Sequence, residues 1–351
     1  MKGKALIAMS GGVDSSVAAL LTLRDGYECI GVTMNLFGSD ESESKCCSLD
    51  DVLDAKSVAK KLGMPHYTFN FKADFEKSVI EPFVAAYEQG ATPNPCICCN
   101  RYLKFAALFL RAKELGCDHI VTGHYARIEK SGDRYKLLRA VDREKDQSYV
   151  LYSLTQEELS HTLFPLGWQT KEQTRTVAEK EGFVSADKPD SQDICFIPDG
   201  DYASFICSRT GKEYPEGDFV DLSGKVLGRH KGIINYTVGQ RKGLGIALGA
   251  PAYVKEIDPK SNRVVLCKNE ELFTDELYAD DFNWISGEAP TGEIGCDACV
   301  RYRGVLKPAK AAVLEDGRVH VSFSEPQRAV TRGQAVVLYR GDEVIGGGTI
   351  I

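Results

Sequence analysis

The sequence predicts an α/β protein in which a parallel sheet is followed by a small irregular β-rich domain and then by an antiparallel β-barrel. Three observations support this prediction. Short apolar runs alternate with helical periodicity up to about residue 197, turn signals and glycines then become frequent, and apolar and polar residues alternate from about residue 273. We place the three domains at residues 1–203, 204–272 and 273–351.

The elements of the first domain follow from two kinds of pattern. Short apolar runs rich in β-branched or aromatic residues predict strands, and apolar residues at helical spacing predict helices. The strands are placed at residues 4–9, 28–37, 66–71 and 117–126, and the helices at residues 15–26, 49–63 and 100–116. Ligands of open α/β sheets gather at the carboxyl ends of the strands, so Gly123 and His124 should lie beside the loop that follows the first strand.

Composition limits the class of protein. With 43% hydrophobic and 26% charged residues, the chain is typical of a soluble globular protein, and no apolar run approaches the length that spans a membrane. The first residues lack the pattern of a signal peptide, so we expect a cytoplasmic protein. A net charge of −7 argues against a surface that binds nucleic acid everywhere, but it permits a local basic face. The twelve cysteines are too sparse for a secreted scaffold, which favours reduced thiols, metal ligation or redox chemistry.

The loop "SGGVDSS", residues 10–16, follows the first strand and opens the first helix. Two glycines permit a tight turn, and a helix N-terminus attracts an anion. The loop has neither the lysine of a Walker A motif nor the spacing of a dinucleotide fingerprint. Ser10, Ser15 and Ser16 could donate to phosphate oxygens, and Asp14 could hold Mg²⁺. The alternative is a glycine turn that merely caps a helix.

This loop resembles the pyrophosphate loop of N-type ATP pyrophosphatases, whose fold is also called adenine nucleotide alpha hydrolase-like. The resemblance implies that ATP is cleaved between its α and β phosphates and that a substrate oxygen becomes adenylated.

Two loops bear the cysteines that stand out. In "GATPNPCICCNRYLKF", residues 90–105, three cysteines lie at the start of a predicted helix, whose dipole should lower their pKa. In "DKPDSQDICFIPDGDY", residues 187–202, Cys195 lies in a second loop rich in proline and aspartate. Together with "TGHYA", "KDQSYVLY" and "NYTVGQRKGLG" in the same order, these loops resemble the tRNA-specific 2-thiouridylase family through essentially the whole chain.

The resemblance implies ATP-dependent 2-thiolation of the wobble uridine of tRNA, with adenylation of the uracil C2 oxygen and release of AMP and pyrophosphate. It implies that Cys195 carries sulfur as a persulfide and that Cys99 is the partner thiol, the two forming a transient disulfide. The implied ATP contacts are Ala8, Met9, Ser10, Gly11, Gly12, Val13, Asp14, Ser15, Ser16, Met34 and Gly123. The implied neighbours of the target base are Asn94, Pro95 and Cys96. The implied tRNA contacts are His124, Lys145, Asp146, Gln147, Arg301, Tyr302 and Gln334.

The implied cofactors are ATP and Mg²⁺, and the implied partners are tRNA and a sulfur donor, which is a cysteine desulfurase, a relay protein or free sulfide. We expect a monomer. One residue departs from the family: many members have aspartate three residues before the partner cysteine, and here Cys96 occupies that position. Cys96, Cys99 and Cys195 could therefore hold a [4Fe–4S] cluster with one open iron that binds sulfide. The persulfide route and the cluster route both remain open at this stage.

Blander interpretations apply to several other residues. Cys29, Cys117, Cys207, Cys267 and Cys299 are expected to be inert, while Cys46 and Cys47 could have a metal or redox role. The triplet at residues 145–147 could be a polar turn between two strands, and the basic stretches at residues 227–245 and 299–310 could be solvated surface.

Competing functions are an ATP pyrophosphatase that thiolates another RNA position or amidates a small substrate, and a non-enzymatic ATP-gated tRNA-binding module or sulfur carrier.

Overall fold

The computed structural model describes residues 2–37, 49–186, 188, 194–246 and 249–351. Its first domain contains a parallel sheet with the strand order β3-β2-β1-β4-β7. The strands are β1 (Lys4–Ala8), β2 (Glu28–Asn35), β3 (His66–Asn70), β4 (His119–Val121) and β7 (Thr162–Leu163). The predicted sheet is confirmed, but the fourth strand ends at Val121 rather than continuing to residue 126.

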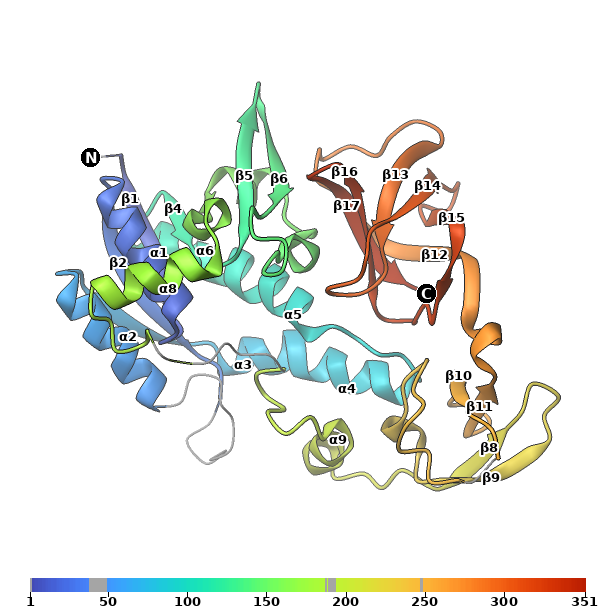
Figure 1. Ribbon diagram of the computed structural model, residues 1–351. Helices are drawn as coiled ribbons and strands as arrows, with labels where there is room; N and C mark the ends of the chain where they lie inside the picture. The colour runs from blue at the N-terminus through green and yellow to red at the C-terminus, as the bar shows by residue number, and fades with distance from the viewer. Residues whose placement is uncertain (1, 38–48, 187, 189–193, 247–248) are drawn as a thin grey trace.

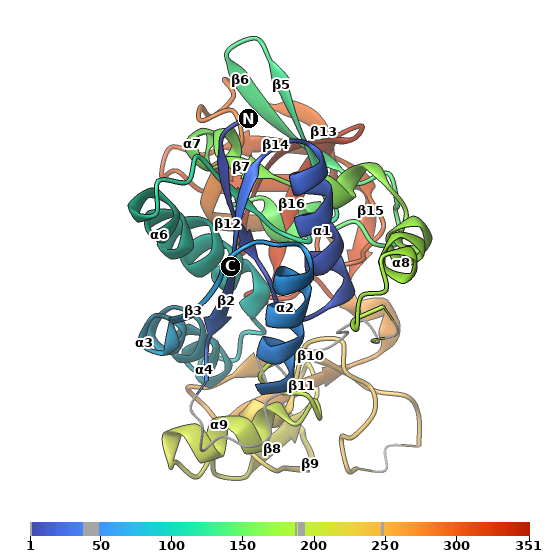
Figure 2. The same cartoon turned by 90° about the vertical axis from the view of Figure 1, so that its left-hand side faces the viewer.

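Helices cover both faces of this sheet, as Figures 1 and 2 show. One face packs against α1 (Val13–Arg24), α2 (Leu49–Lys61) and α8 (Lys171–Lys180). On the other face lie α3 (Lys72–Phe75), η1 (Glu76–Ile80), α4 (Glu81–Glu88), α5 (Pro95–Cys98), η2 (Cys99–Ala107) and α6 (Leu108–Glu114). The helix predicted at residues 100–116 is present, but its first part, η2, is π-helical.

A hairpin that the periodicity did not reveal stands between the sheet of the first domain and the barrel (Figure 1). It consists of β5 (Ala126–Ser131) and β6 (Arg134–Arg139), and it meets β17 of the barrel through the pair Glu343 and Leu138. The remaining elements of this domain are η3 (Ser148–Leu151), α7 (Gln156–Ser160) and η4 (Pro165–Trp168). Many of the hairpin residues are charged and exposed, so no apolar alternation marked them as strands.

The second domain is small and irregular, as predicted. Its elements are α9 (Tyr202–Thr210), β8 (Gly217–Val220), β9 (Val226–His230), η5 (Ile233–Asn235), β10 (Tyr253–Asp258), β11 (Arg263–Cys267) and η6 (Asn269–Leu272). Its sheet has the order β10-β11-β8-β9. Side chains such as Phe219 and Val254 share one apolar core with Phe83 of α4, so this domain packs directly against the first.

The third domain is a closed antiparallel barrel, which confirms the predicted architecture. Its strands are β12 (Phe273–Trp284), β13 (Ile294–Cys299), β14 (Lys307–Val313), β15 (Val319–Arg328), β16 (Ala335–Arg340) and β17 (Glu343–Ile350). They follow the order β12-β15-β14-β13-β16-β17, and pairing between β12 and β17 closes the barrel. Among the residues that the structure describes, none of the helices combines the length and the apolarity that crossing a membrane requires.

Gly167 offers a test of the packing between the sheet domain and the hairpin. A Cβ atom at this position would lie 1.8 Å from the carbonyl oxygen of Ala126. We expect Gly167→Ala to lower the free energy of unfolding by about 3 kcal/mol or more, because overpacking forces the backbone apart. Urea denaturation followed by circular dichroism measures this loss. Gly295→Ala is the control, since its Cβ would meet no atom within 4 Å, and equal urea midpoints for the two variants would contradict the prediction.

Candidate active site

The carboxyl ends of β1 and β4 bring two sequence motifs together, as expected. Gly11 has a φ of +75°, and a Cβ atom there would lie 2.3 Å from the carbonyl oxygen of Asp51, so only glycine fits. A Cβ atom on Gly123 would lie 2.8 Å from the amide nitrogen of Ser15. The end of β4 therefore packs against the first turn of α1.

The hydroxyl groups of the loop are arranged differently from the expectation. Ser15 and Ser16 are buried, and their hydroxyls donate to the carbonyl oxygen of Gly12 at 3.1 and 2.9 Å. Ser10 is exposed, and its amide donates to the Ser15 hydroxyl at 3.2 Å. Thus two of the three serine hydroxyls bond within the loop itself. The helix has no side-chain cap, which leaves first-turn N–H groups as the donors that an anion can meet.

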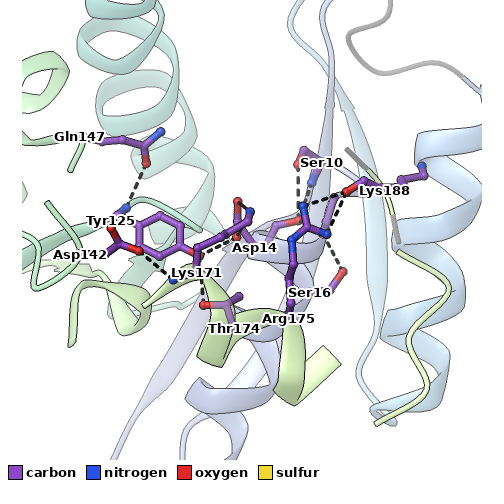
Figure 3. Close-up of polar contacts among 12 residues, drawn as sticks. Ser10, Asp14, Ser16, Tyr125, Asp142, Gln147, Lys171, Thr174, Arg175 and Lys188 are labelled. Carbon is purple, nitrogen blue, oxygen red and sulfur yellow. Dashed lines mark hydrogen bonds and ion pairs between the residues drawn. The ribbon is translucent and has the colours of Figure 1, made fainter. Parts of the chain in front are cut away.

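Asp14 is held by groups of the chain itself. The ammonium group of Lys171 lies 2.8 Å from both carboxylate oxygens, and the Tyr125 hydroxyl donates to one of them at 2.8 Å (Figure 3). Lys171 is the first residue of α8, directly after the N-cap Thr170. From the sequence, Asp14 was expected to be able to hold Mg²⁺, and nothing indicated that Lys171 would pair with it. The only local signal was the "TKEQ" capping box, which marks a helix start but not its neighbour.

Two further basic residues anchor the chain next to this loop. Arg175 of α8 donates to the carbonyl oxygens of Ala186 and Lys188 at 2.9 and 3.2 Å. The ammonium group of Lys188 lies 2.9 Å from a carboxylate oxygen of Asp51 in α2. These contacts fix residues 186 and 188, at the start of the segment that contains Cys195.

The cysteine-rich segment begins with a defined cap. The Asn94 side chain accepts a hydrogen bond from the amide of Cys96 at 3.1 Å, and Pro95 occupies the first turn of α5. Cys96 is exposed, whereas Cys99 is partly covered. Cys96 and Cys195 each contribute to raising the pKa of Cys99, and Cys99 and Cys195 pack against one apolar core although they come from two loops.

The thiols of this segment are not activated in the resting structure. Burial raises the pKa of Cys99 to about 12, and the positive charge of Lys104 offsets only part of this effect. Loss of hydration also raises the pKa of Cys96, and the neighbouring Cys195 adds to this effect. The expectation that the helix dipole lowers the pKa of these thiols is therefore wrong, because desolvation outweighs it.

The thiol cluster was also tested as an iron–sulfur site. Within the described residues, no group of three or more His, Cys, Asp or Glu side chains is arranged to hold a metal ion. Cys96, Cys99 and Cys195 thus do not form a ligand set for a [4Fe–4S] cluster in this arrangement, and no chemical step is derived through one. Cys46 and Cys47 lie outside the described residues.

The residues implied as tRNA contacts fall into two groups. His124 is buried beside the rings of Phe105 and Phe164, and burial holds its pKa well below the usual range. Asp146 accepts from the amide of Ala140 at 2.9 Å, and Gln147 accepts from the amide of Tyr125 at 3.0 Å. These three side chains therefore make their contacts within the protein. Residues 145–147 form a connection between β6 and η3 rather than a turn between two strands.

The barrel residues of the same set lie nearer the surface. Arg301 is exposed, and Tyr302 is half-buried with its ring 6.0 Å from that of Tyr149. The Gln334 side chain donates to the carbonyl oxygen of Thr92 at 2.7 Å, and the Thr92 amide donates to the carbonyl of Arg332. The barrel thus holds the segment that leads into the cysteines.

The parallel sheet, the Gly-Gly loop and the open N-terminus of α1 define an α/β domain with the ATP pyrophosphatase fold. Family models match the whole arrangement: "tRNA methyl transferase HUP domain" over residues 3–199, "tRNA methyl transferase PRC-barrel domain" over 203–268, and "Aminomethyltransferase beta-barrel domain" over 274–350.

Two relatives identify the family. A protein of Carboxydothermus hydrogenoformans named "tRNA-specific 2-thiouridylase MnmA" is 51% identical over 354 residues, which cover 99% of this chain and 97% of the relative. One of the same name from Acetivibrio thermocellus is 52% identical over 356 residues, 99% of each chain. The chain belongs to the tRNA-specific 2-thiouridylase family. A solved 4-thiouridine synthetase in complex with RNA and ATP is similar to 53% of this chain and 43% of its own, at 20% identity and a TM-score of 0.37, too low to bear on function.

Lys104 gives a test of the thiol environment. Because its positive charge lowers the pKa of Cys99, we expect Lys104→Gln to move the pH profile of Cys99 alkylation toward higher pH and to slow labelling at neutral pH. Iodoacetamide labelling followed by peptide mass spectrometry measures the profile. Lys113→Gln on α6 is the control, and an unchanged or more acidic Lys104→Gln profile would show that another charge governs Cys99.

Proposed function

We propose that this protein uses ATP to convert the wobble uridine of tRNA to 2-thiouridine. The observation that carries the proposal is that Cys99 and Cys195, two thiols distant in sequence, pack against the same apolar core in a domain with an open helix N-terminus at the edge of its sheet. Membership of the 2-thiouridylase family supports the same reaction. We further propose that the protein acts in the cytoplasm as a monomer.

The first step activates the base. The C2 carbonyl of uracil is a poor electrophile, so its oxygen attacks the α-phosphorus of ATP, and the bond to the β-phosphate breaks with release of pyrophosphate. The amides at the start of α1 and the Gly11–Gly12 turn are suited to hold the phosphates where negative charge develops. The proposed nucleotide contacts are Ala8 to Ser16, Met34 and Gly123.

The second step transfers sulfur. A donor persulfide transfers its outer sulfur to the Cys195 thiolate and leaves as a thiolate, and the outer sulfur of the resulting Cys195 persulfide attacks C2 while AMP leaves. The Cys99 thiolate then attacks the inner sulfur, so that the S–S electrons pass to the sulfur now on C2 and a Cys99–Cys195 disulfide forms. Alternatively Cys99 attacks the persulfide first and releases hydrosulfide as the nucleophile, which ends in the same disulfide. Two electrons from an external thiol reductant then restore both thiols.

The tRNA is proposed to lie over the exposed basic groups of the second domain and the barrel. Arg229, Lys231, Arg241 and Lys242 in the former and Arg301 and Arg303 in the latter are exposed to solvent. Tyr302 and Lys145 complete this proposed surface, and Asn94, Pro95 and Cys96 border the base. His124, Asp146, Gln147 and Gln334 are proposed to act on the tRNA by positioning the segments that touch it, since their side chains bond within the chain.

The first experiment is mass spectrometry of nucleosides from unmodified tRNA after anaerobic incubation with the protein, Mg²⁺, a persulfide donor and a thiol reductant, with and without ATP. We expect 2-thiouridine only when ATP is present. Cleavage of ATP to AMP without thiolated nucleoside would point to an amidated substrate or another donor. A thiolated base elsewhere in the RNA would indicate a different target, and nucleotide binding without cleavage would support the non-enzymatic module.

The cysteine roles have their own test. We expect Cys99→Ala and Cys195→Ala each to lower thiolation by at least about 1,000-fold, because each removes a covalent participant, while ATP binding stays nearly unchanged. Cys207→Ala on α9 is the matched control and should retain activity. Product formation by either of the first two variants would remove that cysteine from the chemistry.

The persulfide and cluster routes differ in iron content. Protein purified anaerobically should contain no iron or labile sulfide if the persulfide route operates, and it should be active with a persulfide donor. Stoichiometric iron and sulfide that disappear in Cys96→Ala would instead favour the cluster route.

A further inference from the structure

A buried lysine lies at the proposed phosphate site without a role in the reaction described above. The Lys171 side chain is only 10% exposed, and its ammonium group contacts both carboxylate oxygens of Asp14, which is itself 33% exposed. Asp14 belongs to the first turn of α1, where the free N–H groups are. The lysine therefore reaches the helix terminus that the nucleotide phosphates are proposed to approach.

The charges at this terminus explain why a cation is needed. The negative charge of an aspartate in the first turn of α1 interacts favourably with the helix dipole, but the same charge repels an incoming triphosphate. Lys171 neutralises that charge and adds the N-terminal end of a second helix, because it is the first residue of α8. Burial of an ammonium group is costly unless it is paired, so the carboxylate of Asp14 also fixes where the lysine stands.

Neighbouring groups leave Lys171 little freedom to move elsewhere. The Lys171 amide donates to Asp142 at 2.9 Å, and the Tyr125 hydroxyl, which bonds Asp14, also lies 3.0 Å from the hydroxyl of Thr174. Figure 3 shows Lys171 and Arg175 extending from α8 toward the segment that contains Ser10 and Asp14. The positive charge of Lys171 is thus presented at one place before any ligand arrives.

We propose that Lys171 binds the β- and γ-phosphates of ATP and stabilises the pyrophosphate as it leaves, while Asp14 positions the ammonium group. This inference rests on the proposed function in one respect, namely that the chain binds ATP at the loop of residues 10–16. A compact ammonium donor suits this task, because it follows the charge that develops on the leaving oxygen.

The test compares ligands that differ in the phosphates. Isothermal titration calorimetry with Mg²⁺ gives the Kd of ATP, of AMP and of inorganic pyrophosphate for wild type and for Lys171→Met. We expect the variant to bind ATP and pyrophosphate about 10- to 100-fold more weakly than wild type, the range of a charge-assisted contact. Its affinity for AMP should change by less than about twofold. A purely structural role would weaken ATP and AMP equally, and this result would overturn the proposal.

Two further variants control for folding. Lys171→Met leaves Asp14 unpaired, so the double variant Asp14→Asn/Lys171→Met removes both charges and should still discriminate against ATP relative to AMP. Wild-type ATP affinity in that double variant would overturn the proposal. Lys180→Met, at the exposed end of the same helix, should bind all three ligands as wild type does.

The outcome is separable from that of the thiolation assay. If wild type binds ATP but forms no 2-thiouridine, the proposed function fails while the comparison of ATP with AMP still decides the role of Lys171. If wild type binds no ATP, this result contradicts both the proposed function and the proposed role of Lys171.

Discussion

The short, largely buried segment from Asp146 to Leu154 joins the sheet domain to the barrel. The placement of these two domains relative to each other depends on its hydrogen bonds. Its polar groups bond in both directions: Asn100 donates to the Val150 carbonyl at 2.9 Å, the Tyr149 hydroxyl donates to the Ala335 carbonyl at 2.8 Å, and Asn283 donates to the carbonyls of Tyr152 and Leu154 at 2.7 and 3.0 Å. Unpaired backbone groups in such a place would be costly, so each half of the protein completes the hydrogen bonding of the other.

The segment from Asp146 to Leu154 also fixes the position of Cys99 relative to Asp14. Asn100 directly follows Cys99, and Gln147 bonds both the amide and the carbonyl of Tyr125, whose hydroxyl reaches Asp14. The helix that follows Cys99 and the loop that contains Asp14 are therefore both tied to this segment by hydrogen bonds of buried or half-buried groups. Buried contacts of this kind preorganise a site more firmly than long exposed side chains do.

The sheet, its helical layers and the barrel could be predicted because they depend on local apolar periodicity. The turn at Gly11 could also be predicted, since only glycine tolerates its backbone. The pair between Asp14 and Lys171 could not, because 157 residues separate them and the contact exists only once α8 packs on α1. The raised pKa of Cys99 was hidden for a related reason: the helix dipole is visible in the sequence, but the protein mass that removes water from the thiol is not.

The position of the last barrel strand in the chain constrains the order in which the domains fold. β17 follows every other barrel strand, yet it closes the barrel against β12 and meets the hairpin at Leu138. During synthesis the sheet domain emerges first and can begin to fold, as N-terminal domains do. The groups of residues 146–154 that bond to Ala335 and Asn283 must wait for the barrel. During synthesis the loop of residues 10–16 can therefore form before the barrel completes the hydrogen bonds of residues 146–154, which in turn hold the helix that follows Cys99.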